Sequence, residues 1–549
     1  MKKLMSLVLF VFVLGLFAPN TGQAAGGFKD VSPNYTFYNE VLYLSSEEII
    51  SGFPDGTFKP NDTVTRAQAA IMIGRALDLN GNQRDTTFRD VTSNVTGSGY
   101  IAAAVEKGII SGFPDGTYKP YQPVTRGQMA IFLNRAFTLT TGQGNGFSDV
   151  SFNMAAYQSI LNVSANRIAS GYPDGTYRPD LAVTRGQFSA FMARTLEPSF
   201  RGISIPDKNL EKAIRETLNK PAGNITAADM NRITRIDGVG YSIKNLSGIE
   251  YAKNLTYLDL GVNEISDISG LSGLTKLRVV HLSSNKISNI SALSGLTKLE
   301  TLDLSINQIS DASALKGLTK LQVLHLFQNE ISDISALRGL TNLIDLDLSA
   351  NKIIDISALS ELNTLYMLAL SYNNISDINV LRKLNTLQDL ALAGNKISDI
   401  SALKGLTNLY ALSLHYNEIN DIRALSGLTK LTSLNLNTNE LSNIRALSSL
   451  TKLEDLNLSA NELSDISGLG TLTNLTILDL TSTGISDISV LSKLTNLQGL
   501  YLSINKISDI TPLSKLADLR YLNITDNELN SESQKIIKNL KARGVIIAY

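Results

Sequence analysis

The chain has 549 residues, with 49 lysines and arginines against 50 aspartates and glutamates, three histidines and no cysteine. This length allows about three to five domains. The balanced charge lacks the basic excess of nucleic-acid-binding proteins, and the residue counts leave no disulfide, no thiolate nucleophile and little imidazole chemistry. We therefore expect no enzyme, no nucleic-acid partner, and no cofactor or metal.

The amino-terminal residues have the pattern of a secretion signal. Lys2 and Lys3 precede an apolar run from Leu4 to Ala18, and small residues follow at 22–25. This order is typical of a signal peptide, and the run is shorter than the roughly 20 residues that span a bilayer. We predict a signal peptide over residues 1–24, cleavage after Ala24 or Ala25, and no membrane span.

A motif then occurs three times at nearly constant spacing. Gly-x-Pro-Asp-Gly-Thr begins at Gly52, Gly112 and Gly171, which are 60 and 59 residues apart. Each copy follows an aromatic-x-Asp-Val segment and precedes Val-Thr-Arg-x-Gln and an amphipathic run. Pro-Asp-Gly favours a turn. The repeats predict three modules, at residues 28–79, 88–139 and 147–198.

The Thr-Arg-x-Gln segment predicts a helix start. Thr65 and Gln68 have the spacing of a capping box, in which each side chain bonds the other's backbone amide. The arginine between them, Arg66, Arg126 or Arg185, opposes the helix dipole, yet all three modules contain it. A guanidinium beside helix-start amides suits a carboxylate or phosphate. The alternative is that each arginine forms a salt bridge between modules.

These three motifs together resemble the S-layer homology domain, here present as a triplet. The resemblance implies a mostly helical, pseudo-threefold trimer that binds a pyruvylated secondary cell-wall polymer, an anionic glycan of Gram-positive bacteria, through Arg66, Arg126 and Arg185. Gln replaces the glutamate that usually follows the Thr-Arg pair. Gly108 ends a helix in the middle module, where Glu48 and Arg167 occupy the other two modules, so we expect unequal grooves.

A second repeat begins at Leu255. Leucine returns every 22 residues as far as Leu519, giving thirteen copies of a leucine-rich repeat over residues 254–529. The Leu-x-Leu step predicts strands that point Leu258 and Leu260 inward and Asp259 outward. The expected fold is an α/β solenoid with a parallel concave sheet and short helical or 3₁₀ convex turns.

Polar residues recur at fixed positions in these repeats. Asn263 and its equivalents are expected to be buried and hydrogen-bonded where each coil turns. Thr483 interrupts this series and has fewer hydrogen-bonding groups than asparagine, which predicts a local weak point in that coil. Asp267 and its equivalents are interpreted as caps of the following turn; a cation-binding stack is the alternative.

The solenoid needs covers at both ends. We expect a helical cap at residues 203–253 and a second cap at residues 530–549, with Ile536, Ile537 and Leu540 on one helical face. A helical cap followed by 22-residue coils with repeated Ile-Ser-Asp-Ile-Ser resembles the internalin family of bacterial surface proteins. The resemblance implies a curved platform that binds a protein partner, often on a host cell.

The variable concave positions indicate where such a partner binds. They include exposed histidines and large apolar side chains, unlike the uniform Leu and Ile of the core. The alternative is that these residues are tolerated surface variation. The candidate partner-binding residues are His325, Phe327, Met367, Tyr372, His415 and Tyr416.

Together these patterns predict a secreted protein at the cell wall or S-layer surface of a Gram-positive bacterium. The triplet would anchor it non-covalently, and the solenoid would bind an unidentified protein, in adhesion or host interaction. The alternative is a structural envelope protein whose solenoid mediates lateral assembly.

Overall fold

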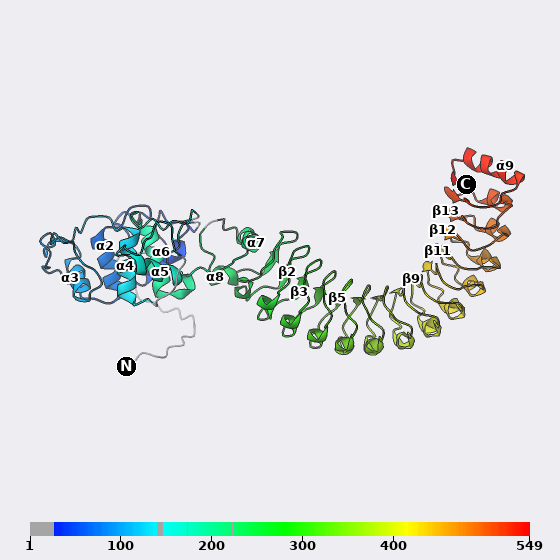
Figure 1. The fold of residues 1–549 in the computed structure, drawn as a ribbon, viewed down its shortest axis with the longest axis horizontal. Coiled ribbons are helices and arrows are strands. Elements are labelled where there is room, and N and C mark those ends of the chain that lie inside the picture. Colours follow the sequence, from blue (N-terminus) through cyan, green and yellow to red (C-terminus); the bar gives the residue numbers. More distant parts are fainter. Residues whose placement is uncertain (1–26, 34, 140–145, 173, 222) are drawn as a thin grey trace, which may run out of the picture. The chain divides into compact units, whose positions relative to one another are not determined.

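The computed structural model describes residues 27–33, 35–139, 146–172, 174–221 and 223–549. The predicted signal peptide, residues 1–24, lies outside the described residues. The chain divides into two compact units, the first ending at Gly202 and the second running from Ile203 to Tyr549 (Figure 1).

The described part of the first unit contains two α-helices in each predicted module. The second helix of each module packs against the first helix of the next, so that α2 contacts α3, α4 contacts α5, and α6 returns to α1. The helices are α1 Tyr38–Ser46, α2 Arg66–Ala76, α3 Ser98–Glu106, α4 Arg126–Phe137, α5 Tyr157–Ala165 and α6 Arg185–Leu196, followed by the 3₁₀ helix η1 Pro198–Phe200.

A ring of backbone hydrogen bonds closes this unit. Val64 N–H donates to the carbonyl of Val183 at 3.0 Å, Val183 N–H to Val124 at 2.9 Å, and Val124 N–H to Val64 at 2.8 Å. All three valines are fully buried. Three chemically equivalent bonds in a closed cycle confirm the predicted pseudo-threefold trimer.

In each module the aspartate of the opening segment fixes the following turn. Asp30 accepts hydrogen bonds from the amides of Phe58 and Lys59, both at 2.7 Å, and Asp90 and Asp149 accept the corresponding amides in the other modules. A Cβ at Gly52 would lie 2.5 Å from the Phe28 ring. The aromatic-x-Asp-Val and Gly-x-Pro-Asp-Gly-Thr segments are therefore parts of one packed element.

The described residues of the second unit form a 15-stranded parallel sheet in which the strands follow sequence order. Each pairing from β1 to β14 is a shift of 22 residues, as in Leu258 with Val280. The strands line the inner edge of the arc (Figure 1). They are β1 Arg235–Asp237, β2 Tyr257–Asp259, β3 Val279–His281, β4 Thr301–Asp303, β5 Val323–His325, β6 Asp345–Asp347, β7 Met367–Ala369, β8 Asp389–Ala391, β9 Ala411–Ser413, β10 Ser433–Asn435, β11 Asp455–Asn457, β12 Ile477–Asp479, β13 Gly499–Tyr501, β14 Tyr521–Asn523 and β15 Ile546–Ala548.

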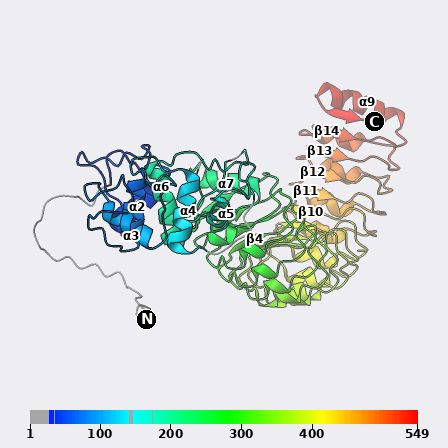
Figure 2. The ribbon, with the colours of Figure 1, turned by 60° about the vertical axis from the view of Figure 1, so that its left-hand side comes forward.

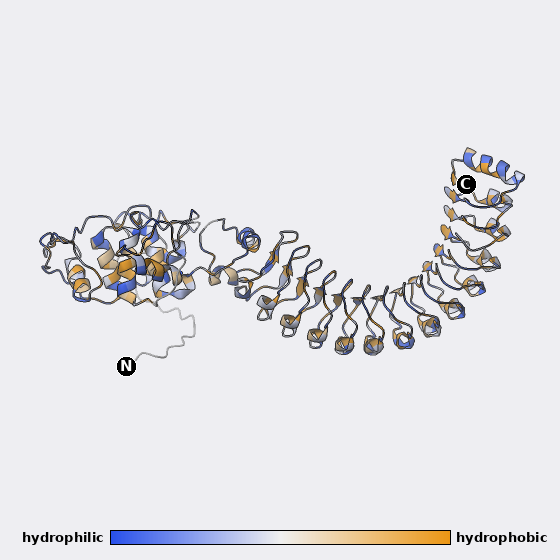
Figure 3. Cartoon of the chain, in the orientation of Figure 1, coloured by the Kyte–Doolittle hydropathy of each residue, from blue (hydrophilic) through white to orange (hydrophobic). Residues whose placement is uncertain are grey.

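Short 3₁₀ helices form the outer, convex edge. Leucine and isoleucine side chains from both edges fill one continuous core, and hydrophobic residues recur in every coil (Figure 3). The turns are η2 Ile249–Tyr251, η3 Ser269–Leu271, η4 Ser291–Leu293, η5 Ser313–Leu315, η6 Ser335–Gly339, η7 Ser357–Glu361, η8 Asn379–Lys383, η9 Ser401–Gly405, η10 Arg423–Gly427, η11 Arg445–Ser449, η12 Ser467–Thr471, η13 Ser489–Lys493 and η14 Thr511–Lys515. The expected solenoid is thus confirmed.

The repeated asparagines form the expected buried ladder. In Asn373, which is 7% exposed, Oδ1 accepts from Ile353 N–H at 2.9 Å, and Nδ2 donates to the carbonyls of Leu348 and Leu370, both at 3.0 Å. Each asparagine therefore satisfies backbone groups of its own coil and of the coil before it.

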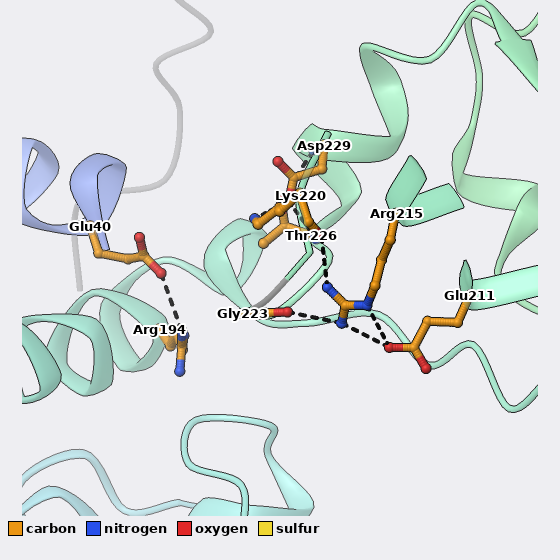
Figure 4. Close-up of polar contacts among 8 residues, drawn as sticks. All are labelled: Glu40, Arg194, Glu211, Arg215, Lys220, Gly223, Thr226 and Asp229. Carbon is orange, nitrogen blue, oxygen red and sulfur yellow. Dashed lines mark hydrogen bonds and ion pairs between the residues drawn. The ribbon is translucent and has the colours of Figure 1, made fainter. Parts of the chain in front are cut away.

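The amino-terminal end of the solenoid is covered by helices. α7 Lys208–Leu218 and α8 Ala227–Asn231 precede the sheet. Arg215 Nη2 bonds Glu211 at 2.7 Å and the Gly223 carbonyl at 3.0 Å, and Lys220 pairs with Asp229 at 2.8 Å (Figure 4). The segment expected to be a helical cap, residues 203–253, also contains β1 and η2, so a first coil already lies within it.

The other end is closed by α9 Ser531–Ala542, which lies over the last coils (Figures 1 and 2). Ile536, Ile537 and Leu540 are buried, which confirms the predicted helical face. β15 then pairs with β14 at a shift of 25 residues and is the last strand of the described sheet.

Candidate binding surfaces

Capping boxes position the three module arginines. Thr65 Oγ1 accepts from Gln68 N–H at 3.3 Å, while Gln68 Oε1 accepts from Thr65 N–H at 3.0 Å. The same reciprocal pair begins α4 and α6. This confirms the predicted role of the threonine and glutamine, and it places Arg66, Arg126 and Arg185 at the first position of each helix.

The amides at these helix starts are already engaged. Arg66 N–H donates to the Gln122 carbonyl and Ala67 N–H to the Pro120 carbonyl, both at 2.9 Å, in the next module. Corresponding bonds begin α4 and α6. The expectation that free helix-start amides contribute to an anion site is therefore not met, because a neighbouring module already satisfies them.

The guanidinium groups also form hydrogen bonds to the next module. Arg66 Nε donates to the Tyr118 carbonyl at 2.8 Å and Nη2 to the Ser111 carbonyl at 2.9 Å. Its carbon Cζ lies 4.4 Å from the Tyr118 ring centre, and only 3% of the residue is exposed. Burial lowers the pKa of Arg66. The intermodule link weighed for these arginines is present, but its acceptors are carbonyls and not carboxylates.

Arg126 and Arg185 repeat this arrangement. Arg126 Nε bonds the Tyr177 carbonyl at 2.8 Å. Arg185 Nε bonds the Phe58 carbonyl at 2.7 Å and so joins the third module to the first. The three arginines therefore occupy equivalent positions, and each connects its module to the following one around the ring.

The helix seams between modules are not chemically equivalent. Between α6 and α1, Arg194 Nη2 pairs with Glu40 Oε1 at 3.3 Å (Figure 4). Both residues are buried, and among the described residues Arg194 Nε has no hydrogen-bond partner. Between α4 and α5, the seam is neutral, because Asn162 Nδ2 donates to Asn134 at 2.9 Å. The seam between α6 and α1 is therefore ionic.

On the solenoid, three of the predicted partner-binding residues lie around β5 and β7. His325 ends β5, and its Nε2 lies 3.1 Å from Asp345 Oδ2 on β6. Phe327, two residues further on, is half-buried. Met367 begins β7 and is 48% exposed. A methionine with about half of its surface exposed is available for contact with another molecule.

The other three form a cluster of rings beside β7 to β9. The His415 ring centre lies 6.5 Å from that of Tyr372 and 5.5 Å from that of Tyr416, both edge-on. Ser413 Oγ lies 2.8 Å from His415 Nδ1, and burial lowers the pKa of His415. The tyrosines are 55% and 53% exposed. The structure thus groups these three residues.

Sequence reasoning missed the residue that fixes Tyr372. A Cβ at Gly394 would lie 2.5 Å from Tyr372 Cδ1, and Gly394 has a positive φ of 62°. The ring of one coil therefore packs on the glycine of the next. Gly394 is the one glycine among the residues that precede the ladder asparagines, and the equivalent residue one repeat earlier is Tyr372. This pairing of glycine with tyrosine is the signal that could have identified the contact.

Two family models match the chain. The S-layer homology domain matches residues 27–70, 87–130 and 146–189. The model described as leucine rich repeats (2 copies) matches residues 253–295, 275–317, 319–363, 451–493 and 495–538. In the part of the chain that the structure describes, every helix is too short or too polar to cross a membrane.

Similar proteins fall into two groups. An internalin (inlF) of Listeria monocytogenes is 39% identical, with a TM-score of 0.57, covering 58% of this chain and 95% of that one. Cell surface glycoprotein 1 of Acetivibrio thermocellus is 30% identical over 162 residues, which are 27% of this chain and 7% of that protein. The cellulosome-anchoring protein of the same organism is 29% identical over 158 residues, 27% of this chain and 35% of that protein.

The chain thus spans only a small part of these two curated relatives. Its fold and matches define a modular protein built from surface-associated and binding modules. The chain belongs to the internalin-like leucine-rich-repeat proteins and carries an amino-terminal triplet of S-layer homology domains.

Proposed function

We propose that this chain is a secreted, non-enzymatic protein that the triplet holds at the cell wall of a Gram-positive bacterium, while the concave face of the solenoid binds a protein partner in adhesion or host interaction. The observation that carries the proposal is the exposed ring cluster of Tyr372, His415 and Tyr416 on a solenoid whose other large apolar side chains are mostly buried. Such aromatic groups are typical of interface centres.

The wall-binding part of the proposal concerns an anionic glycan. Arg66, Arg126 and Arg185 are equivalent in position. Nε and Nη2 of each bond carbonyls of another module, so Nη1 is the guanidinium nitrogen that we propose for binding a carboxylate such as that of a pyruvyl ketal. Cosedimentation of the full chain with purified walls tests this. Binding should disappear on walls stripped of secondary polymer; undiminished binding to stripped walls would contradict it.

The arginines also stabilise the trimer, so the variants need a control for folding. Arg126→Lys keeps the charge but loses the paired bonds to two carbonyls of the third module. We expect weaker wall binding with a helical circular dichroism spectrum that is unchanged. Arg135→Lys, on the last turn of the same helix, is the matched control and should bind as the unmodified chain does.

The partner-binding part is tested by capture from host-cell extracts and from envelope extracts. The full chain is compared with a variant in which Phe327, Tyr372 and Tyr416 are replaced by alanine. Capture that is lost in the variant supports adhesion through the concave face. Equal capture by both chains contradicts it.

One feature favours a second candidate function, in lateral assembly of the envelope. β15 is the last strand of the sheet, and its Ile546 is 69% exposed. An exposed edge strand is a template for pairing with another chain. Concentration-dependent self-association in sedimentation velocity, lost in Ile546→Lys, would favour this function over binding of a foreign partner.

A further inference from the structure

The outward strand positions of the concave sheet carry charge of one sign. At the first outward position of β2 to β14, aspartate occurs three times, as Asp345, Asp389 and Asp455; at the second it occurs four times, as Asp259, Asp303, Asp347 and Asp479. Neither position in these described strands holds a lysine or arginine. The whole chain is nearly neutral, so this excess is local to the concave face.

At the second outward position the fold does not need a negative charge. Asp347 Oδ1 accepts the amide of Ser349, two residues ahead, at 2.8 Å. At the same position of other repeats, Asn457 accepts the amide of Ser459 at 2.9 Å, and Asn523 accepts that of Thr525 at 3.2 Å. Asparagine makes the same structural bond, so aspartate adds only charge at this position.

The carboxylates are densest in the middle of the sheet. Asp345, Met367 and Asp389 are register partners on β6, β7 and β8, which places the two carboxylates about 10 Å apart across two strand spacings. The backbone amide of Asp389 donates to the Tyr366 carbonyl at 3.1 Å, whereas its carboxylate forms no hydrogen bond or ion pair with a described residue. Burial and the charge of Asp345 raise the pKa of Asp389.

Tyrosines flank this acidic centre on both sides. Tyr366 and Tyr410 stand immediately before β7 and β9, and each is 45% exposed; Tyr372 and Tyr416 stand after these strands. A tyrosine face attracts the cationic end of lysine or arginine as well as apolar groups. The acidic centre and the tyrosines on both sides therefore all favour a ligand that carries lysine or arginine side chains.

We propose that the concave face over β6 to β9 binds a basic protein segment, one whose lysine or arginine side chains reach Asp345, Asp347 and Asp389 while its apolar side chains contact the flanking tyrosines. This inference rests on the proposed function and specifies the chemistry of the partner. Charge complementarity of this kind accelerates encounter and rejects acidic surfaces.

The test uses the full chain and a library of random 15-residue peptides displayed on phage. We expect the selected peptides to carry a net positive charge. A synthetic copy of the strongest should lose affinity about tenfold between low and physiological salt, since screening weakens exposed charge pairs. It should also bind the triple variant Asp345→Asn, Asp347→Asn, Asp389→Asn about tenfold more weakly.

The control variant changes the same number of charges elsewhere. Asp333, Asp355 and Asp399 cap the next turn outside the concave sheet, and Asn289 and Asn443 already do so in other repeats. Replacing those three aspartates by asparagine should leave peptide affinity unchanged. Equal weakening in both variants would overturn the inference.

The outcomes separate this inference from the function on which it rests. Neutral or acidic peptides that lose binding on Tyr372→Ala and Tyr416→Ala, but not on the concave aspartate variant, would overturn the basic partner and leave protein binding intact. Selection of no peptide that depends on either set of residues would overturn both.

Discussion

Removal of one ladder asparagine tests the physical account of the solenoid. Asn373 lies near the middle of the series, and Asn373→Ala deletes both its acceptor and its donors. The carbonyl of Leu348 keeps a second donor in Asn351, and that of Leu370 keeps one in Asn395. The amide of Ile353 has no second partner among the described residues and lies in the core.

The expected loss of stability follows from that single orphaned amide. An unsatisfied buried N–H costs about 1–3 kcal/mol, and weakening of the shared carbonyl bonds adds about 1 kcal/mol. We therefore expect Asn373→Ala to lower the free energy of unfolding of the solenoid by about 3 kcal/mol.

Denaturant unfolding, with exchange of the Ile353 amide measured alongside, supplies the assay. Asp377→Asn, in the exposed capping position of the same repeat, is the control and should change stability by less than about 0.5 kcal/mol. A loss below about 1 kcal/mol in Asn373→Ala, with Ile353 still protected, would refute the ladder argument.

The surroundings of three other residues determine whether their substitution raises or lowers stability. Glu40→Gln leaves Arg194 buried without its counter-ion and should lower the free energy of unfolding by about 3 kcal/mol, measured by calorimetry. Adding Arg194→Met to this variant should recover part of the loss. An unchanged unfolding transition in Glu40→Gln would contradict this. Asp389→Asn should raise stability at neutral pH, because burial and Asp345 raise the pKa of this carboxyl in the folded state, so its ionised form opposes folding. This gain in stability should vanish once the pH falls below the pKa of Asp389 in both the folded and the unfolded state. A gain that grows in acid would contradict the reasoning. Gly394→Ala should cost about 1 kcal/mol at a positive φ and reduce peptide binding by displacing Tyr372, whereas unaltered binding would show that Tyr372 does not need this support.

Periodicity predicted most of the fold. The 22-residue repeat determined strand register, inward leucines and buried asparagines, because each coil is one unit that must stack on an identical neighbour. The first coil was missed for a specific reason: Ile233, Ile236 and Ile243 occupy its core positions, and Tyr241 stands where the asparagine would be. A search for leucine and asparagine alone starts one coil too late.

Other features depend on contacts between distant residues. The sequence predicted that Arg66 lies at a helix start. It did not predict that carbonyls of the next module accept hydrogen bonds from both its guanidinium and the helix-start amides. Similarly, Thr483 was expected to weaken its coil. In the structure the Leu463 amide bonds the Thr483 carbonyl at 3.0 Å, so a backbone oxygen takes the place of the missing asparagine oxygen. The weak point stays a prediction, which hydrogen exchange around Thr483 tests.

The most direct test measures wall binding by the triplet and partner binding by the solenoid in one experiment. Purified walls are coated with the full chain or with the Phe327→Ala, Tyr372→Ala, Tyr416→Ala variant and are then incubated with host-cell or envelope extract. The walls are sedimented, and the proteins that they retain are identified. We predict that both chains sediment with the walls and that only the chain with the intact concave face retains a partner. Identical retained proteins with both chains, or a chain that stays in solution, would contradict the account.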